Sequence, residues 1–356
     1  MMDPKTRHRL RKAARQTLLY LVVITITLVI MTPVYFITVL SFLTTREAYA
    51  YPLPLYPTFT IRMKMERGKR GYLLSVWDRN ERAYVSVLDT DDVDKMRVYM
   101  ETYLGLKPTN EQVVAVMRQV DAAGGQPVYF AWRRHILSNY ATFFRVTRDA
   151  VPALIRSLQI AALTIVISLS IGGAAGYAFA RYRFYGKNAL KFSVLFVRMF
   201  PGVAIAIPMV IILARIGLYD RPAGLSLLYS VGVIGMTVWI TASIFMAIPV
   251  SLEEAAMVFG ATRLQAFLRI TLPLAFPGLA AAAMYAFIAA WNETVAAIIL
   301  TEFNPTFSVV VYQTLLGATG QVNLTAAGGM AMALPAVVFT FFIRRYIHQM
   351  WGGVTV

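Results

Sequence analysis

Several long stretches of this 356-residue chain carry almost no charged side chains, and they limit its possible folds more than any other feature. These stretches cover residues 18–30, 160–180, 203–214 and 275–299. About 20 apolar residues in a helix cross the hydrocarbon core of a bilayer, so the longer stretches predict membrane-spanning helices. The composition, 58% hydrophobic and 15% charged, agrees with a membrane protein rather than a soluble one.

The apolar pattern predicts six spans, each long enough for a tilted helix: about 17–43, 153–180, 190–214, 224–249, 275–300 and 325–343. The basic segment before the first span resembles the start of a signal peptide. However, the apolar run 17–43 is much longer than the roughly 7 to 15 residues of a signal-peptide core. We therefore predict that the first span is not cleaved from the chain.

The net charge of +16 comes from basic residues that lie mostly beside the predicted spans. A nucleic-acid site would interleave basic and aromatic residues on a water-exposed face, so no nucleic-acid partner is predicted. Basic loops mark the cytoplasmic side of a membrane protein. One side here carries the basic N-terminal segment with Arg181, Arg183, Lys187, Lys191, Arg344 and Arg345. The sequence thus predicts a multi-pass protein of the inner membrane, in contact with lipid, with both termini in the cytoplasm.

A long polar segment between the first two spans would lie outside the cytoplasm, and it carries most of the acidic residues of the chain. Asp91 or Asp92 can cap a helix there, and Thr109 with Gln112 forms the capping-box signature of another. We predict a small α+β insertion over 44–137, with an irregular loop as the alternative. Apolar and polar residues alternate in three runs that predict strands joined by turns: 59–65, 72–77 and 84–88.

The loop between the fourth and fifth spans, about 250–273, has the pattern of two helices joined by a tight turn. Residues 252–259 are good helix formers, Gly260 can adopt the left-handed conformation that ends a helix, and Thr262 can cap the next one. Pro273 marks a bend where the chain returns to the bilayer. The first helix would expose apolar side chains to the cytosol, and such a surface needs a partner protein to cover it.

At this loop the chain resembles the permease subunits of binding-protein-dependent ABC importers, in particular the maltose-type carbohydrate branch. The family signature is Glu-Ala-Ala, three residues, Gly, nine residues, Ile, one residue and Leu-Pro. Every position is filled here, by Glu254, Ala255, Ala256, Gly260, Ile270, Leu272 and Pro273. The resemblance covers about residues 139–356. The chain departs from the family at Phe259, where many relatives carry aspartate, and over 44–137, which has no counterpart in shorter relatives.

The resemblance agrees with an all-α membrane fold of six transmembrane helices, and the residue pattern adds the small α+β insertion outside the cytoplasm. The predicted parts of the chain are a basic N-terminus with the first helix (1–43), the insertion (44–137) and the transmembrane domain (138–356). Within the transmembrane domain, the loop 250–273 would couple the chain to an ATPase. The signature residues together with Glu253 would make that contact.

The implied partners are a second permease subunit, two copies of a cytoplasmic ABC ATPase, and an extracytoplasmic solute-binding protein that delivers a sugar or oligosaccharide. The chain contains no Gly-x-x-x-x-Gly-Lys-Ser/Thr phosphate-binding motif. ATP and Mg would therefore bind to the partner ATPase, and this chain would hold no cofactor and be no enzyme. It has no cysteine and only three scattered histidines, which form no pattern for a metal site or for catalysis.

A polar and aromatic cluster, Trp291, Asn292 and Glu293, lies within the fifth span. An ionisable residue in a span faces protein or water, and stacking with hydrogen bonding suits a sugar. These residues are therefore candidates for the substrate path, with a structural hydrogen bond between helices as the alternative. Glu293 also leaves open an ion-coupled secondary transporter that acts alone and uses buried carboxylates. A membrane-anchored sensor would leave the pattern from Glu254 to Pro273 unexplained.

Overall fold

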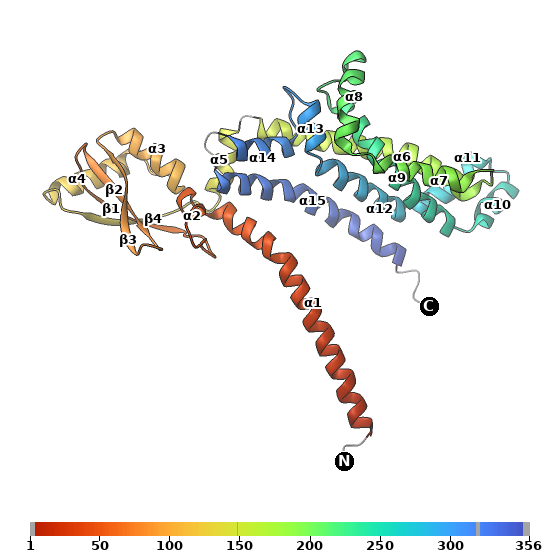
Figure 1. Cartoon of the computed structure of the whole chain (residues 1–356), viewed down its shortest axis with the longest axis horizontal. Helices are drawn as coiled ribbons and strands as arrows, with labels where there is room; N and C mark the ends of the chain where they lie inside the picture. The colour runs from red at the N-terminus through yellow and green to blue at the C-terminus, as the bar shows by residue number, and fades with distance from the viewer. Residues whose placement is uncertain (1–3, 148, 318–320, 352–356) are drawn as a thin grey trace. The chain divides into compact units, whose positions relative to one another are not determined.

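The chain divides into two compact units, which Figure 1 shows with their helices and strands labelled. The first unit takes in the residues before 147 together with 317–330, and the second takes in the remainder. The predicted segments 1–43 and 138–356 include residues 1–3, 148, 318–320 and 352–356, which lie outside the described residues. The computed structural model describes residues 4–147, 149–317 and 321–351.

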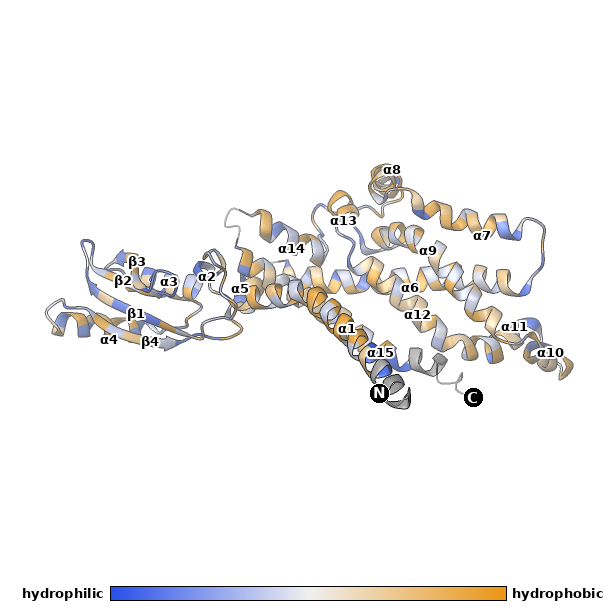
Figure 2. Cartoon of the chain, turned by 60° about the horizontal axis from the view of Figure 1, so that its bottom comes forward, coloured by the Kyte–Doolittle hydropathy of each residue, from blue (hydrophilic) through white to orange (hydrophobic). Residues whose placement is uncertain are grey.

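The first unit begins with helix α1 (Pro4–Phe42), which is long and apolar enough over residues 12–42 to cross a membrane. Its side chains from 12 to 35 are exposed, as expected for a helix surrounded by lipid, and Figure 2 shows their apolar character. A short helix, α2 (Thr45–Ala48), follows. Thr44 and Glu47 cap it through reciprocal hydrogen bonds, which satisfy N–H groups at its start.

An antiparallel sheet of four strands, in the order β3-β2-β1-β4, forms one layer of the polar segment. In β1 the central residue Met63 pairs with Val76 on one side and with Phe130 on the other. The three predicted strands are present with slightly different ends, whereas the fourth was not predicted. The strands are β1 (Thr60–Arg67), β2 (Tyr72–Asp78), β3 (Ala83–Thr90) and β4 (Val128–Arg133).

Two helices, α3 (Val93–Leu104) and α4 (Asn110–Ala122), contribute to one hydrophobic core with the sheet. Both predicted caps are present. The carboxylate of Asp92 accepts hydrogen bonds from the N–H groups of Asp94 (2.9 Å) and Lys95 (3.1 Å), and Thr109 forms its capping box with Gln112. The core is built from fully buried side chains of the sheet and of both helices, among them Met63, Leu74, Met96, Met100, Val113 and Val120.

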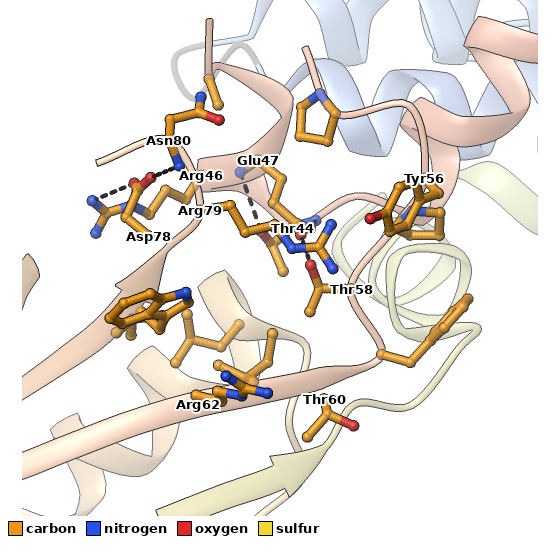
Figure 3. A pocket seen from close by; sticks show the side chains of 18 residues that line it. Thr44, Arg46, Glu47, Tyr56, Thr58, Thr60, Arg62, Asp78, Arg79 and Asn80 are labelled. Atoms are coloured by element: carbon orange, nitrogen blue, oxygen red, sulfur yellow. Dashed lines mark hydrogen bonds and ion pairs between the residues drawn. The ribbon is translucent and has the colours of Figure 1, made fainter. Parts of the chain in front are cut away.

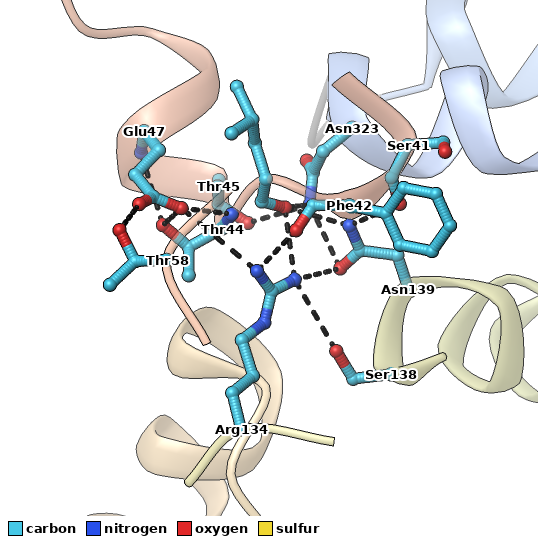
Figure 4. A network of polar contacts seen from close by, with 11 residues as sticks. Ser41, Phe42, Thr44, Thr45, Glu47, Thr58, Arg134, Ser138, Asn139 and Asn323 are labelled. Carbon is cyan, nitrogen blue, oxygen red and sulfur yellow. Dashed lines mark hydrogen bonds and ion pairs between the residues drawn. The ribbon is translucent and has the colours of Figure 1, made fainter. Parts of the chain in front are cut away.

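Arg134, directly after β4, joins the sheet to the end of α1 (Figure 4). Its guanidinium donates to the carbonyl oxygens of Phe42 and Leu43 and to Oδ1 of Asn139 (3.2 Å) in helix α5 (Ser138–Val146). The amide of Asn139 donates in turn to the carbonyl of Leu43 (2.7 Å). A cation and an amide therefore satisfy carbonyl groups that the C-terminal end of α1 leaves free.

Because the sheet and its two helices share one core, residues 44–137 expressed alone are expected to fold. The excised segment should give dispersed amide signals in a ¹H–¹⁵N NMR spectrum, since its strands and caps depend on contacts within the segment. The control is the segment with Leu74→Asn. Leu74 is fully buried, so a polar amide at this position should unfold the segment and remove the dispersion. A collapsed spectrum of the unsubstituted segment would contradict the expectation.

Three long helices pack together in the second unit: α6 (Ala150–Arg181), α9 (Pro222–Ala247) and α12 (Leu272–Trp291). Helices α6 and α9 approach closely because α6 carries small residues. A Cβ atom added to Gly176 would lie 2.0 Å from Oγ1 of Thr241, and that hydroxyl donates a hydrogen bond to the carbonyl of Gly172 (3.0 Å). These glycines serve close helix packing, which is common in membrane proteins.

The third span, predicted as one helix over 190–214, is instead a bent pair. Helix α7 (Lys187–Phe196) continues into the 3₁₀ turn η1 (Val197–Met199), and α8 (Gly202–Arg215) leaves at an angle of 88°. Proline disfavours the helical conformation of the residue before it, and Phe200, which precedes Pro201, is extended with φ −70° and ψ 132°. The prediction of one continuous helix was therefore wrong at this proline.

The fifth span, predicted over 275–300, is also interrupted. Helix α12 ends at Trp291, and a short helix, α13 (Val295–Leu300), follows after a break. The carboxylate of Glu293 accepts a hydrogen bond from the N–H of Ala296 (2.9 Å). It thereby satisfies a donor in the first turn of α13 and stabilises the break.

The last two helices are α14 (Phe307–Leu316), which is short, and α15 (Val322–Trp351), which is long enough to span. Among the described residues, five helices are long and apolar enough to cross a membrane, or six if the bent pair counts as one span. The fold is thus mostly helical with five to six candidate spans. This agrees with the predicted helical membrane fold.

Candidate functional site

Helix α10 (Val250–Val258) is followed, after its C-cap residue Phe259, by a glycine whose backbone conformation is rare for other residues. Gly260 has φ +90°, as the sequence predicted for a left-handed helix end. Its N–H donates to the carbonyl of Met257, and the N–H of Ala261 donates to that of Ala256, both at 3.0 Å. Nothing lies within 4 Å of a Cβ atom built on Gly260. Backbone conformation, and not a lack of space, therefore favours glycine here.

The second half of the loop returns the chain to the transmembrane helices. Thr262 caps the short helix α11 (Arg263–Ala266) through a capping box with Gln265, as predicted. A π-helical turn, η2 (Phe267–Thr271), then leads directly into α12. Pro273 is the second residue of α12, and the helix runs through it from α11 to Trp291. The signature residues Ile270 and Leu272 are half-buried in this connection.

One end of α10 presents apolar side chains that no described residue covers. Val258 is 84% exposed and Phe259 is 91% exposed, and Leu252 is exposed as well. The side chains of Glu254 and Ala255 are also exposed, and that of Ala256 is partly buried. An exposed apolar patch with a nearby carboxylate has the character of a protein interaction surface.

Glu253, by contrast, points inward and holds α10 against three other elements. Its residue is only 7% exposed. Oε1 accepts hydrogen bonds from Nε of Arg181 (2.7 Å) and from Oγ1 of Thr271 (2.6 Å), and Oε2 accepts one from the hydroxyl of Tyr177 (2.8 Å). Arg181 also donates from Nη1 to the carbonyl of Phe245 (2.8 Å) at the end of α9. The carboxylate therefore connects α10 to α6, η2 and, through Arg181, α9.

The surroundings of Glu253 favour its ionised form. Burial of the carboxyl group raises its pKa, but the hydrogen bonds from Thr271, Arg181 and Tyr177 and the charge of Arg181 lower it by more, so the pKa is lowered overall. The ring of Tyr177 packs against those of Phe245 (5.5 Å) and Phe267 (4.5 Å). Aromatic packing thus excludes water from one side of the ion pair.

Sequence reasoning included Glu253 among the coupling residues but did not find its buried network. Arg181 was interpreted only as a marker of the cytoplasmic side, and Tyr177 and Thr271 were not selected. A carboxylate and an arginine more than seventy residues apart give no local signal. The one available hint was an arginine directly at the end of a predicted span, where a partner is needed if the side chain is buried.

The candidates for the substrate path do not form one cluster. Trp291 is only 4% exposed, stacks on Phe287 (5.4 Å between ring centroids) and donates from Nε1 to the carbonyl of Met332 (3.0 Å). Its ring therefore contributes to the core of the second unit. Asn292 is exposed at the break between α12 and α13.

Glu293 lines a small cavity of about 210 Å³, which Arg198 and Tyr285 also line. The guanidinium of Arg198 lies over the ring of Tyr285, 5.4 Å from its centroid. A carboxylate, a guanidinium and an aromatic ring at one cavity are groups that can contact a polar ligand. No group of three or more metal-ligating side chains occurs among the described residues.

Helices able to cross a membrane, together with a loop that has a buried anchor and an exposed apolar helix end, are the features of a membrane-embedded protein with a surface suited to protein contact. Residues 168–351 match the family described as binding-protein-dependent transport system inner membrane component. The chain belongs to this family. The resemblance found in the loop 250–273 is therefore confirmed.

Similar proteins include the trehalose transport system permease protein SugB of Mycobacterium tuberculosis, 36% identical over 213 residues that cover 59% of this chain and 77% of SugB. The maltodextrin transport system permease protein MdxG of Bacillus subtilis is 32% identical over 203 residues, which cover 56% and 73% of the two chains. A crystal structure of a bacterial ABC transporter involved in the import of the acidic polysaccharide alginate has the same fold. The match has a TM-score of 0.57 and 16% sequence identity. It covers 98% of the present chain and 99% of the transporter chain.

Proposed function

We propose that this chain is a permease subunit of an ATP-driven importer and forms the translocation path for a sugar or oligosaccharide that an extracytoplasmic binding protein delivers. The observation that carries the proposal is the construction of α10, whose apolar end is exposed while Glu253 fixes the opposite side to the transmembrane helices. A helix held in this way can transmit the movement of a bound partner. The named sugar permeases among its relatives support the substrate class.

The partners of this assembly are a second permease subunit, two copies of a cytoplasmic ATPase that bind ATP and Mg, and the binding protein. The loop 250–273 docks on the ATPase through Glu254, Phe259 and the neighbouring residues of α10. In this arrangement both termini lie in the cytoplasm of a six-span inner-membrane protein. Segment 1–43 supplies the first span, 44–137 lies outside the cytoplasm and 138–356 forms the transmembrane domain.

The substrate path runs past the break between α12 and α13, where Asn292 and Glu293 face solvent or a cavity. Trp291 supports this region by packing and does not line the path. An ion-coupled transporter acting alone is the second candidate, because Glu293 could serve as its coupling carboxylate. That function would leave the exposed end of α10 without a partner, and we therefore favour the importer.

The docking role of α10 is tested with Gly260→Val, Gly260→Asn and Glu254→Ala in the assembly reconstituted with the ATPase and the binding protein. A β-branched residue at φ +90° costs roughly 1 to 3 kcal/mol and misdirects the helix end. We expect Gly260→Val to lose sugar-stimulated ATPase activity and transport. Gly260→Asn should keep more of both activities, since asparagine tolerates positive φ, and Glu254→Ala should weaken binding of the ATPase.

The reconstituted samples are compared by sugar-stimulated ATP hydrolysis, by uptake into liposomes and by co-purification of the ATPase. Affinity of the binding protein for sugar should not change in any variant, which separates a docking defect from a delivery defect. Full, sugar-stimulated transport by Gly260→Val would contradict the docking role. Transport by the chain alone, driven by an ion gradient, would favour the second candidate instead.

A further inference from the structure

The polar segment of the first unit contains an open cavity of about 700 Å³. Figure 3 shows it between the stretch that follows α1 and the end of strand β2. Sites for small molecules typically have volumes of roughly 300 to 1,000 Å³, so the cavity is large enough for a ligand of several rings. It lies within one compact unit, and its walls come from α2, the chain 50–62 and β2.

Three arginines line this cavity, and two of them have no acidic partner among the described residues. Arg46 forms an ion pair with Asp78 (2.9 Å). Arg79 lies over the ring of Tyr56, 4.8 Å from its centroid, without an acceptor for its donors. Arg62 projects from β1 and is exposed, and it likewise has no acceptor among the side chains described. Figure 3 places Arg62 and Arg79 around the same hollow.

The two acidic side chains of the cavity are already engaged. Asp78 binds Arg46 and also accepts hydrogen bonds from the N–H groups of Asn80 (2.8 Å) and Glu81 (3.2 Å). Glu47 accepts from the hydroxyl of Thr58 and takes part in the cap of α2. The lining therefore offers unpaired positive charge, and the planar, fork-like guanidinium group is suited to bind a carboxylate through two parallel hydrogen bonds.

Aromatic rings stand beside these arginines. Tyr56 is 65% exposed and Phe59 is 46% exposed, and the half-buried Trp77 is held edge-on by Tyr84 (5.1 Å). Flat apolar rings of this kind stack on the faces of sugar rings, and their polar edges bind hydroxyl groups. A simple organic anion would leave these rings unused, and a neutral sugar would leave the guanidinium groups of Arg62 and Arg79 without a partner.

We propose that this cavity is a binding site for an acidic saccharide, in which Arg62 and Arg79 bind the carboxylate groups of the sugar while Tyr56 and Trp77 stack on its rings. The site is separate from the translocation path and from α10. It does not depend on the proposed transport function, because binding to the purified chain is measured without ATPase or binding protein. A negative result here would leave that function untouched.

The test uses the full chain in lipid nanodiscs and measures binding of trigalacturonate, galacturonate and the neutral maltotriose by microscale thermophoresis. We expect trigalacturonate to bind at least tenfold more tightly than maltotriose, with an affinity that falls as salt is raised. Comparable affinities of trigalacturonate and galacturonate would assign the site to a single acidic ring. A clear preference for the trimer would assign it to a chain of such rings, and both results support the site.

The double variant Arg62→Gln/Arg79→Gln should lose at least tenfold in affinity for trigalacturonate. Arg118→Gln is the matched control, because Arg118 is exposed on α4 in the same unit and lies outside the cavity. Arg79→Lys keeps the charge but loses the planar fork, so its affinity should fall between the two. Thermal unfolding of each variant shows whether the unit remains folded.

Three outcomes would overturn the assignment. One is equal binding of trigalacturonate and maltotriose, and another is an equal loss of affinity in Arg118→Gln and the double variant. The third is the absence of saccharide binding at millimolar concentration. In that case, association with a purified binding protein is measured as well, and in this outcome the double variant weakens it. That last result would make the cavity a protein contact rather than a sugar site.

Discussion

Replacing Glu253 by alanine is expected to destabilise the second unit strongly and to abolish transport. The change leaves the guanidinium of Arg181 buried without its carboxylate and removes acceptors for Tyr177 and Thr271. Breaking a buried ion pair from one side costs roughly 3 to 5 kcal/mol. Thermal unfolding of the detergent-purified chain should therefore shift to a clearly lower temperature.

Glu254→Ala is the matched control, because Glu254 is adjacent in sequence but exposed, and its unfolding temperature should be nearly unchanged. The double variant Glu253→Met/Arg181→Met removes both charges. It should be less destabilised than the sum of the single variants, since no unpaired buried charge remains at this site. Equal unfolding temperatures of Glu253→Ala and Glu254→Ala would show that the ion pair does not hold α10 in place.

The same pair gives a pH dependence with a defined sign. The pKa of Glu253 is lower in the folded chain than its ordinary value, so its contribution to stability is complete above that ordinary value. The contribution is lost as the pH falls through the lowered pKa of the folded state. Acidification should consequently destabilise the unaltered chain more than Glu253→Gln, which cannot lose a charge at this position.

Replacement of Arg134 by methionine is expected to loosen the junction between α1 and the sheet. The side chain of Arg134 is only 1% exposed, and the change leaves the carbonyl groups of Phe42 and Leu43 with fewer donors in a buried place. Each unsatisfied buried polar group costs about 1 to 3 kcal/mol. We expect the free energy of unfolding to fall by roughly 2 to 5 kcal/mol. The loss is limited because Asn139 still donates to the carbonyl of Leu43.

Limited proteolysis of the full chain measures this loss, with cleavage between residues 44 and 60 as the readout. Arg133→Met is the control, because Arg133 is the neighbouring residue, at the end of β4, and is exposed. Arg134→Lys should be intermediate, since lysine keeps a positive charge but lacks the planar group that binds the carbonyls of Phe42 and Leu43 and Oδ1 of Asn139 together. If Arg134→Met and Arg133→Met are cleaved at the same rate, the network does not hold the junction.

Features with a local cause could be predicted from the sequence. The left-handed turn at Gly260 follows from the missing Cβ atom, and the caps at Asp92, Thr109 and Thr262 follow from side chains that accept hydrogen bonds from N–H groups two or three residues later. Strands β1 to β3 also follow from local alternation. The signature of the loop identified the family before any contact was known.

Features that depend on distant partners could not be predicted in this way. The burial of Glu253 and the role of Arg134 depend on which helices meet, and neither residue carries a local pattern. Strand β4 follows two helices and is recognised only by its pairing with β1. The break after Trp291 was missed because the apolar residues on both sides gave one continuous run.

The position of β1 in the sheet has a consequence for the synthesis of the chain. Met65 pairs with Val128, so one edge of β1 stays open until more than sixty further residues have been made. At usual translation rates this takes roughly 3 to 13 seconds. During that time the open edge can pair with another nascent chain, and a folding helper that shields it would raise the yield of the assembled protein.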